Sequence, residues 1–312
     1  MALGIPDLLA DGPRPAADIG AATSIDPERI ERLLRGLVVL GVVHEVDGRG
    51  YANTEVGNVL RADVPDSRRP LAMMHFPQSY RAWEHFLETL RTGVTGHSLA
   101  YGGTLWETLA TDGDFAARFN ELQAANSKAV GDFVVANGDF GGARVVVDVG
   151  GGRGALLAAV LQAHRKARGI VCDVPAGLAE TRSFLAEAGV GDRAQVVEGD
   201  FFQAVPSGAD VYLLKDILHD WPDEAARRIL GVCRSAMQDG ARLMVVERSV
   251  PSHVSADPAQ LNRVMTDLQM MVLFDGRERT PEQFSALFDR ARLKLTRVVP
   301  GETYSLIEAL AV

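Results

Sequence analysis

The stretch RVVVDVGGGRGALLAAVLQAHRKA, residues 144–167, decides the fold class. A continuous apolar run of strand length leads into a glycine-rich loop, and residues 155–167 then show helical spacing of leucine and valine. Further apolar runs at residues 169–173, 194–200, 210–216 and 241–247 alternate with helical segments such as residues 222–238. This alternation predicts an α/β domain with a doubly wound, mostly parallel sheet.

Residues 293–312 contain two extended runs that are joined by Pro300 and Gly301. A Pro-Gly pair is typical of a tight turn. We therefore expect a terminal antiparallel hairpin at the edge of a Rossmann-like sheet.

Residues 1–66 contain short helical segments followed by a small hairpin. Asp26 is expected to cap a helix that begins at Pro27, and Thr54 to cap a later one. This order is typical of a winged helix, which binds DNA in some proteins and serves as a packing or dimerisation module in others. We predict a mostly helical winged-helix dimerisation domain over 1–96 and a second domain over 97–312, with a helical bridge at about 104–138.

The composition limits the classes of partner. The chain has 312 residues, 47% hydrophobic content and a formal net charge of −9. Affinity for phosphates comes mainly from clustered Lys and Arg, so this charge disfavours nucleic acid and anionic membranes and favours a small-molecule partner. There is no apolar run of about 18 residues and no signal-peptide pattern at the start, so we expect a cytoplasmic protein. Cys172 and Cys233 lack metal-ligand spacing and are expected to be buried free thiols, and no metal site is predicted.

The glycine loop after the first strand predicts a nucleotide-like ligand. Gly150, Gly152 and Gly154 allow the backbone to approach a ligand without side-chain obstruction. The spacing Gly150-x-Gly152-x-x-Ala155 also matches the dinucleotide fingerprint. On the loop alone, an NAD enzyme is therefore possible.

Acidic residues at the strand ends distinguish between two kinds of cofactor. Asp173, 23 positions after Gly150, can accept hydrogen bonds from both ribose hydroxyls, as it would in an NAD enzyme. Asp148, two positions before Gly150, would repel a pyrophosphate and suits the cationic end of a ligand. Asp200 and Phe201 are suited to bind the adenine amino group and to cover the adenine ring. We therefore predict S-adenosylmethionine as the cofactor.

Six motifs occur in the order seen in one enzyme family: VVVDVGGGRG (145–154), CDVP (172–175), EGDFF (198–202), LKDILHDWPDE (214–224), MVVERSVP (244–251) and DLQMMVLFDGRERTPEQF (267–284). Through them nearly the whole chain resembles the class I S-adenosylmethionine-dependent O-methyltransferases of the plant caffeate and bacterial natural-product type. The resemblance implies a metal-independent reaction and an N-terminal winged-helix dimerisation domain.

The resemblance also implies which residues act at the site. It assigns His219 as the catalytic base, since a neutral imidazole can take the proton of a hydroxyl as the oxygen attacks the methyl carbon. Glu247 and Glu278 match carboxylates that flank and orient this histidine. Asp220 and Asp223 are expected only to complement the N-terminus of the following helix. The implied cofactor-binding residues are Asp148, Gly150, Gly152, Asp173, Gly199, Asp200, Phe201, Lys215 and Trp221.

Two departures from the family pattern affect the substrate and the dimer. Gln123 stands where the family commonly has a methionine, which suggests a more polar acceptor. The chain also begins nearer the winged-helix core than most relatives, which suggests either a shortened gene product or a different dimer arrangement. Residues 30–43 carry more apolar surface than one small domain would bury, so we expect a homodimer built largely from residues 1–96.

The preferred hypothesis is methyl transfer from S-adenosylmethionine to a phenolic hydroxyl of a small aromatic or polyketide-like secondary metabolite. Methylation of nitrogen instead of oxygen stays open. The first alternative is an S-adenosylmethionine-binding homologue with hydroxylase or decarboxylase activity, which the retained His219 disfavours. The second alternative is a ligand-sensing DNA-binding regulator, which the isoelectric point near 5.3 disfavours.

Overall fold

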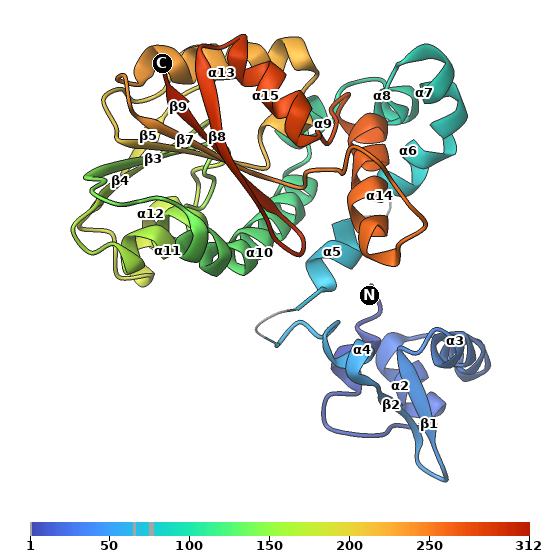
Figure 1. The fold of residues 1–312 in the computed structure, drawn as a ribbon. Helices are drawn as coiled ribbons and strands as arrows, with labels where there is room; N and C mark the ends of the chain where they lie inside the picture. Colours follow the sequence, from blue (N-terminus) through green and yellow to red (C-terminus); the bar gives the residue numbers. More distant parts are fainter. Residues whose placement is uncertain (1, 65–66, 75–77) are drawn as a thin grey trace. The chain divides into compact units, whose positions relative to one another are not determined.

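The computed structural model describes residues 2–64, 67–74 and 78–312 (Figure 1). The chain divides into two compact units, Met1–Pro77 and Gln78–Val312. Within the described residues, no helix is long and apolar enough to cross a membrane.

The first unit consists of short helices followed by an antiparallel hairpin. Its helices are α1 (Ile5–Leu8), α2 (Ala16–Thr23), α3 (Pro27–Val39), α4 (Glu55–Asn58) and α5 (Arg69–Met74), and the hairpin is formed by β1 (Val43–Val46) and β2 (Gly50–Asn53). Asp26 caps α3 by accepting hydrogen bonds from the backbone N–H groups of Glu28 and Arg29, and Thr54 caps α4. Ile19, Ile30 and Leu34 form part of a small core. The predicted helices, caps and hairpin are confirmed.

The second unit contains the predicted doubly wound sheet, with strand order β5-β4-β3-β6-β7-β9-β8. The parallel strands are β3 (Val145–Val149), β4 (Arg168–Asp173), β5 (Ala194–Glu198), β6 (Val211–Lys215) and β7 (Arg242–Glu247). At the other edge, β8 (Leu293–Pro300) and β9 (Ser305–Ala311) form the predicted hairpin, and β9 pairs antiparallel to β7. The fold class is confirmed.

Helices cover both faces of this sheet (Figure 1). One face packs on α13 (Asp223–Ala236) and α15 (Pro281–Asp289) through residues such as Val147 and Tyr212. The other packs on α10 (Gly113–Asn137), α11 (Ala155–Ala163) and α12 (Thr181–Glu187) through residues such as Val146 and Leu213. Because successive side chains of a strand point to opposite faces, the central strands read as continuous apolar runs. α11 ends four residues before the predicted end because residues 164–167 turn into β4.

The second unit has further helices: α6 (Tyr80–Glu84), α7 (Phe86–Thr92), α8 (Gly96–Tyr101) and α9 (Leu105–Thr111) precede the sheet in the chain, and α14 (Pro258–Leu273) lies between β7 and α15. Trp83 of α6 donates a hydrogen bond from Nε1 to Gln269 of α14, at 2.5 Å. The predicted bridge at 104–138 is helical, as α9 and α10. The second compact unit begins at Gln78 and therefore includes α6 and α7. The domain boundary that we expected after residue 96 stays a prediction. Cys172 and Cys233 are buried and free, as predicted.

Gly276 allows the segment after α14 to approach the turn that follows β6. A Cβ atom at this position would overlap the carbonyl oxygen of His219 and would lie 2.6 Å from the carbonyl carbon of Asp220. The backbone N–H of the next residue, Arg277, donates to His219 O at 2.8 Å. The absence of a side chain at Gly276 therefore sets how closely these two segments pack.

We expect Gly276→Ala to lower the free energy of unfolding by about 1–3 kcal/mol, the usual cost of overpacking a buried site. Gly231→Ala in α13 is the matched control, because no atom lies within 4 Å of a Cβ there. It should instead stabilise the helix by up to about 1 kcal/mol. Urea denaturation measures both effects. Equal midpoints for Gly276→Ala and the wild type would contradict the proposed packing constraint.

Candidate active site

A cavity of about 450 Å³ lies in the second unit, at the carboxyl ends of β3, β4, β5 and β6. Ligands of open α/β sheets bind at this edge. Helices α9 and α10 supply the remaining wall. Of the predicted cofactor residues, those that line the cavity are Gly150, Gly152, Asp173, Asp200, Phe201, Lys215 and Trp221.

The glycine loop forms the floor of the cavity and has little room for side chains. A Cβ atom at Gly150 would overlap Ile217, and one at Gly151 would lie 2.7 Å from Asp148 Cγ. Gly152 has a φ of 52°, and a Cβ there would meet no protein atom within 4 Å. The side of Gly152 that a side chain would occupy is therefore open, which suits the close approach of a ligand.

Carboxylates at the ends of β4 and β5 face the same cavity. Asp173 accepts hydrogen bonds from the backbone N–H groups of Gly152 and Val174, at 2.8 and 2.7 Å. Burial raises the pKa of Asp173. Asp200 accepts from the backbone N–H of Phe202 and from Gln203 Nε2, at 2.8 and 2.9 Å. Both carboxylates are thus fixed by local hydrogen bonds, and they offer acceptors for the hydroxyl and amino groups of a nucleoside.

Asp148 and Gly199 do not line the cavity, although both were predicted to bind the cofactor. Asp148 is buried behind the loop, and its Oδ2 atom has no hydrogen-bond partner. Burial raises the pKa of Asp148 to about 7, against the opposing effect of Lys215. Gly199 permits the close approach of Cys172, whose Sγ would lie 2.9 Å from a Cβ there. Asp148 thus lies against the glycine loop at Gly151, whereas Gly199 packs against β4.

Aromatic side chains form one wall of the cavity. The indole rings of Trp106 and Trp221 stack at 5.4 Å, with 9° between their planes. Phe201 and Phe202 meet Trp221 edge-on, at 6.3 and 4.8 Å. This wall suits flat rings, such as an adenine or an aromatic acceptor.

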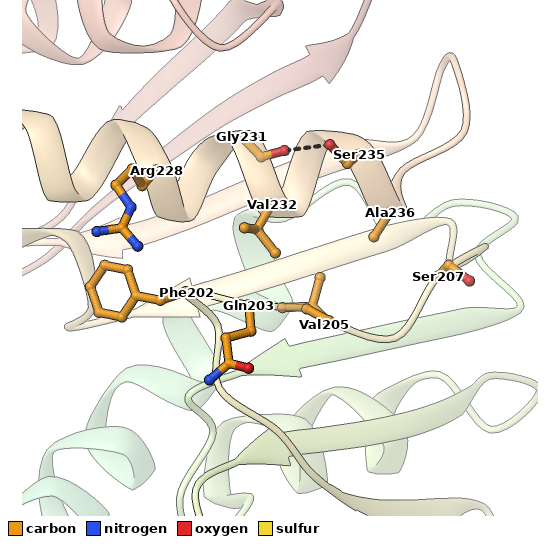
Figure 2. A pocket seen from close by; sticks show the side chains of 10 residues that line it. Phe202, Gln203, Val205, Ser207, Arg228, Gly231, Val232, Ser235 and Ala236 are labelled. Atoms are coloured by element: carbon orange, nitrogen blue, oxygen red, sulfur yellow. Dashed lines mark hydrogen bonds between the residues drawn. The ribbon is translucent and has the colours of Figure 1, made fainter.

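Figure 2 shows a second hollow, of about 460 Å³, between the segment after β5 and α13. Phe202 lines both spaces, and the guanidinium of Arg228 lies 5.3 Å from the centre of its ring. None of the site residues predicted from the sequence lines this second hollow. The predicted site residues therefore favour the first cavity as the candidate active site.

His219 lies on a short 3-10 turn, Leu218–Asp220, directly after β6. Its Nδ1 atom is 2.8 Å from Glu278 Oε1, and its Nε2 atom is 3.4 Å from Asp220 Oδ1 and 3.9 Å from Asp216 Oδ1. The imidazole is buried, and its neighbours Asp216 and Asp220 line the cavity. The expectation that Asp220 only complements a helix N-terminus is therefore incomplete.

Glu247 holds the main chain of this turn and not the imidazole ring. Its Oε1 atom accepts hydrogen bonds from the backbone N–H groups of Leu218 and His219, at 2.6 and 3.1 Å. Burial raises the pKa of Glu247 to about 7. Of the two carboxylates predicted to flank the histidine, only Glu278 contacts the ring.

The imidazole of His219 is surrounded by acidic groups. Burial alone would lower its pKa, but Glu278, Asp220 and Asp216 together raise it to about 10. The carboxylates around the ring thus favour its charged form in the ligand-free protein. The role of His219 as the catalytic base stays a prediction.

Asp216 and Arg279 were not identified from the sequence. Burial alone would raise the pKa of Asp216, but Lys215 and Arg248 hold it well below its usual range. Lys215 forms an ion pair with Asp216, and Arg248 and Tyr304 donate hydrogen bonds to Asp216 at 3.1 and 2.9 Å.

Arg279 is fully buried and donates to the carbonyl oxygens of Leu218 and Trp221. Only the Lys215–Asp216 adjacency was visible in the sequence.

Within the described residues, no cluster of three or more His, Cys, Asp or Glu side chains is arranged to hold a metal ion. The cavity does fit S-adenosylmethionine, because the loop leaves space at Gly152, carboxylates line the cavity for polar groups, and aromatic rings flank it.

Two family models match the chain. The O-methyltransferase domain matches residues 83–294, and the O-methyltransferase dimerisation domain matches residues 1–63.

Individual relatives agree with these models over nearly the whole chain. The phenazine O-methyltransferase of Lysobacter antibioticus is 39% identical over 308 residues, which cover 98% of this chain and 89% of that protein. The phenazine-1-carboxylate N-methyltransferase of Pseudomonas aeruginosa is 35% identical over 311 residues, which cover 99% of this chain and 91% of that protein. The relatives thus include enzymes named for methylation of oxygen and of nitrogen.

A solved structure links this fold to the cofactor. An O-methyltransferase from neocarzinostatin biosynthesis, in complex with S-adenosylmethionine and 2-hydroxy-5-methyl naphthoic acid, matches with a TM-score of 0.86 at 31% identity. The match covers 99% of this chain and 93% of that one. The chain therefore belongs to the O-methyltransferase family and is an S-adenosylmethionine-dependent enzyme.

Proposed function

We propose that this enzyme methylates a phenolic hydroxyl of a small aromatic or polyketide-like metabolite, and that His219 takes the hydroxyl proton. The observation that carries this proposal is the geometry of the imidazole. Glu278 holds Nδ1 at 2.8 Å, which leaves Nε2 directed toward the cavity-lining residues Asp216 and Asp220. A ring held in this way can present one nitrogen to an acceptor.

The cofactor is expected to occupy the side of the cavity formed by the glycine loop. Asp173 would bind the ribose hydroxyls, and Asp200 and Phe201 would bind the adenine. When bound, S-adenosylmethionine supplies a methyl group that is activated by the positive charge on sulfur. The protein must then hold the acceptor oxygen in line and exclude water.

The acceptor is expected to lie against α9 and α10. This side of the cavity is lined by Trp106, Leu109, Ala110, Ala116, Phe119, Asn120 and Gln123. Aromatic and aliphatic groups predominate, which suits a flat ring system. Gln123 and Asn120 add amide groups, which supports the expectation of an acceptor with polar substituents.

We expect a panel of hydroxylated phenazines and naphthoic acids, each paired with its amino analogue, to contain an acceptor that is methylated on oxygen. The relatives' names motivate both ring systems. Mass spectrometry of the products identifies the methylated atom. If only the amino analogues were methylated, the accepting atom would be an amine nitrogen, and the proposed hydroxyl acceptor would be wrong.

We expect His219→Ala to lower turnover by about 10²–10⁴-fold at neutral pH, the usual contribution of a positioned general base. The loss should shrink as the pH approaches the acceptor's own pKa, near 10 for a simple phenol, because a phenolate needs no base. Glu278→Gln should cost less, since it keeps the imidazole in place. Steady-state kinetics over pH measures both.

The control for both variants is the affinity for S-adenosylhomocysteine, measured by calorimetry, which should be nearly unchanged. If His219→Ala kept wild-type turnover with an acceptor whose hydroxyl is still protonated, the imidazole would not be the general base. A hydroxylase or decarboxylase activity would then become the better hypothesis.

We also propose that the protein is a homodimer whose interface includes the first unit. The matched dimerisation domain supports this, as does the exposure of apolar residues at the end of α3. Val39 is 88% exposed and Leu40 is 73% exposed, which is unusual for neighbouring large aliphatic side chains.

We expect light scattering to give a dimer mass at micromolar concentration and the double variant Val39→Lys/Leu40→Lys to give a larger monomer fraction. Val312→Lys, at a residue that is 60% exposed in the second unit, is the control and should leave the mass unchanged. A monomeric wild type would refute the homodimer.

A further inference from the structure

We propose that Asp220 stores the proton that leaves His219, so that Nε2 is free to receive the acceptor's proton. The inference rests on the proposed function, because it assumes that His219 takes the hydroxyl proton. It adds a second proton-accepting group to the site.

The position of Asp220 supports this role. Its carboxylate lies 3.4 Å from Nε2 of His219, closer than any other carboxylate on that side of the ring. Asp220 lines the cavity, although only 5% of the residue is exposed, and His219 does not line it. A proton on Nε2 therefore has an acceptor beside it, at the wall where the acceptor molecule would bind.

The other carboxylates around the ring already have partners. Glu278 contacts Nδ1, Glu247 accepts from the backbone N–H groups of the turn, and Asp216 is paired with Lys215 and Arg248. Within the part of the chain that the structure describes, no lysine or arginine nitrogen lies within 4.0 Å of the Asp220 carboxylate. Of the two carboxylates on the Nε2 side of the ring, Asp216 is paired with cations and Asp220 is the one beside Nε2.

The surrounding charges set the proton affinity of Asp220. Burial raises its pKa to about 7, against the opposing effect of His219. Burial thus disfavours the ionised carboxylate, so Asp220 can take a proton from its neighbour more readily than an exposed aspartate would. The charged groups that face the turn come from β6 and the residue after it (Lys215, Asp216), from the end of β7 (Glu247, Arg248) and from the segment before α15 (Glu278, Arg279).

The proposed transfer occurs in two steps. First, the Nε2 proton of the charged imidazole moves to Asp220 Oδ1, which leaves a neutral ring and a carboxylic acid. Then, as the bond between the acceptor oxygen and the methyl carbon forms and the electron pair of the methyl–sulfur bond stays on sulfur, Nε2 takes the hydroxyl proton. The imidazole is charged again, and Asp220 releases its proton to solvent after the product leaves.

This arrangement gives a pH dependence of known sign. Asp220 can receive a proton only when it is ionised, so turnover should be present above about pH 7 and should fall as the pH drops through this value. The macroscopic pKa in the rate profile belongs to the His219–Asp220 pair and not to either residue alone.

The test is the variant Asp220→Asn, which keeps the shape of the side chain and removes its proton affinity. We expect turnover at neutral pH to fall by about 10²-fold, the low end for loss of a proton-transfer group. The acid limb near pH 7 should disappear, and turnover should rise toward the acceptor's own pKa. The acceptor used is the best substrate of the panel described above.

A readout that does not depend on turnover is the titration of His219 followed by NMR of ¹⁵N-labelled histidine, assigned with His219→Gln. Removal of the negative charge 3.4 Å from Nε2 should lower the pKa of His219 by at least about one pH unit. Asp192→Asn is the control. This aspartate is exposed and lies between α12 and β5, away from the turn, so the variant should change neither the rate profile nor this titration.

Wild-type turnover and an unchanged acid limb in Asp220→Asn would overturn the inference. If His219→Ala still loses turnover in the same assays, only the role of Asp220 has failed. If His219→Ala also keeps its turnover, the proposed function has failed as well.

Should Asp220→Asn not fold, as judged by binding of S-adenosylhomocysteine, Asp220→Glu replaces it and should retain an acid limb at a shifted pH. An acid limb unmoved in Asp220→Glu would equally overturn the inference.

Discussion

The hydrogen bonds from the backbone N–H groups of Leu218 and His219 to Glu247 are the interaction on which the site depends. They fix the turn after β6 to the end of the neighbouring strand β7. On the other side of the turn, Arg279 holds the carbonyl oxygens of Leu218 and Trp221. With its main chain held by a buried anion and a buried cation, the turn can carry His219 and Asp220 in fixed positions. Loss of Glu247 or of Arg279 would leave buried backbone N–H or C=O groups of the turn without these partners, which is destabilising.

The sequence predicted the sheet well because each central strand is buried on both faces and is followed by a helix with clear spacing. It also identified several residues that line the cavity, because residues at the carboxyl ends of parallel strands meet at one edge. Asp148 and Gly199 are not among the lining residues, since position along a strand does not reveal on which side of a loop a side chain lies. Asp148 faces back under Gly151, and Gly199 faces Cys172.

The charge state of His219 could not be predicted from its motif. The motif places Asp216 and Asp220 near the histidine in sequence, but a pKa depends on which nitrogen each carboxylate approaches and on the competing cations. Arg248, Tyr304 and Glu278 come from three later segments, and together they decide which acid is neutralised and which is left beside Nε2. For the same reason, the motif alone does not reveal that Glu278 contacts Nδ1 while Asp216 and Asp220 lie on the Nε2 side.

The stacked indoles of Trp106 and Trp221 have a practical consequence for the study of this enzyme. The chain has three tryptophans, and these two line the cavity with their rings 5.4 Å apart and almost parallel. Their electronic transitions should therefore couple, so that the near-ultraviolet circular dichroism and the intrinsic fluorescence report mainly on the cavity. The enzyme thus contains its own optical probe, and the entry of an aromatic molecule between its walls could be followed without any label.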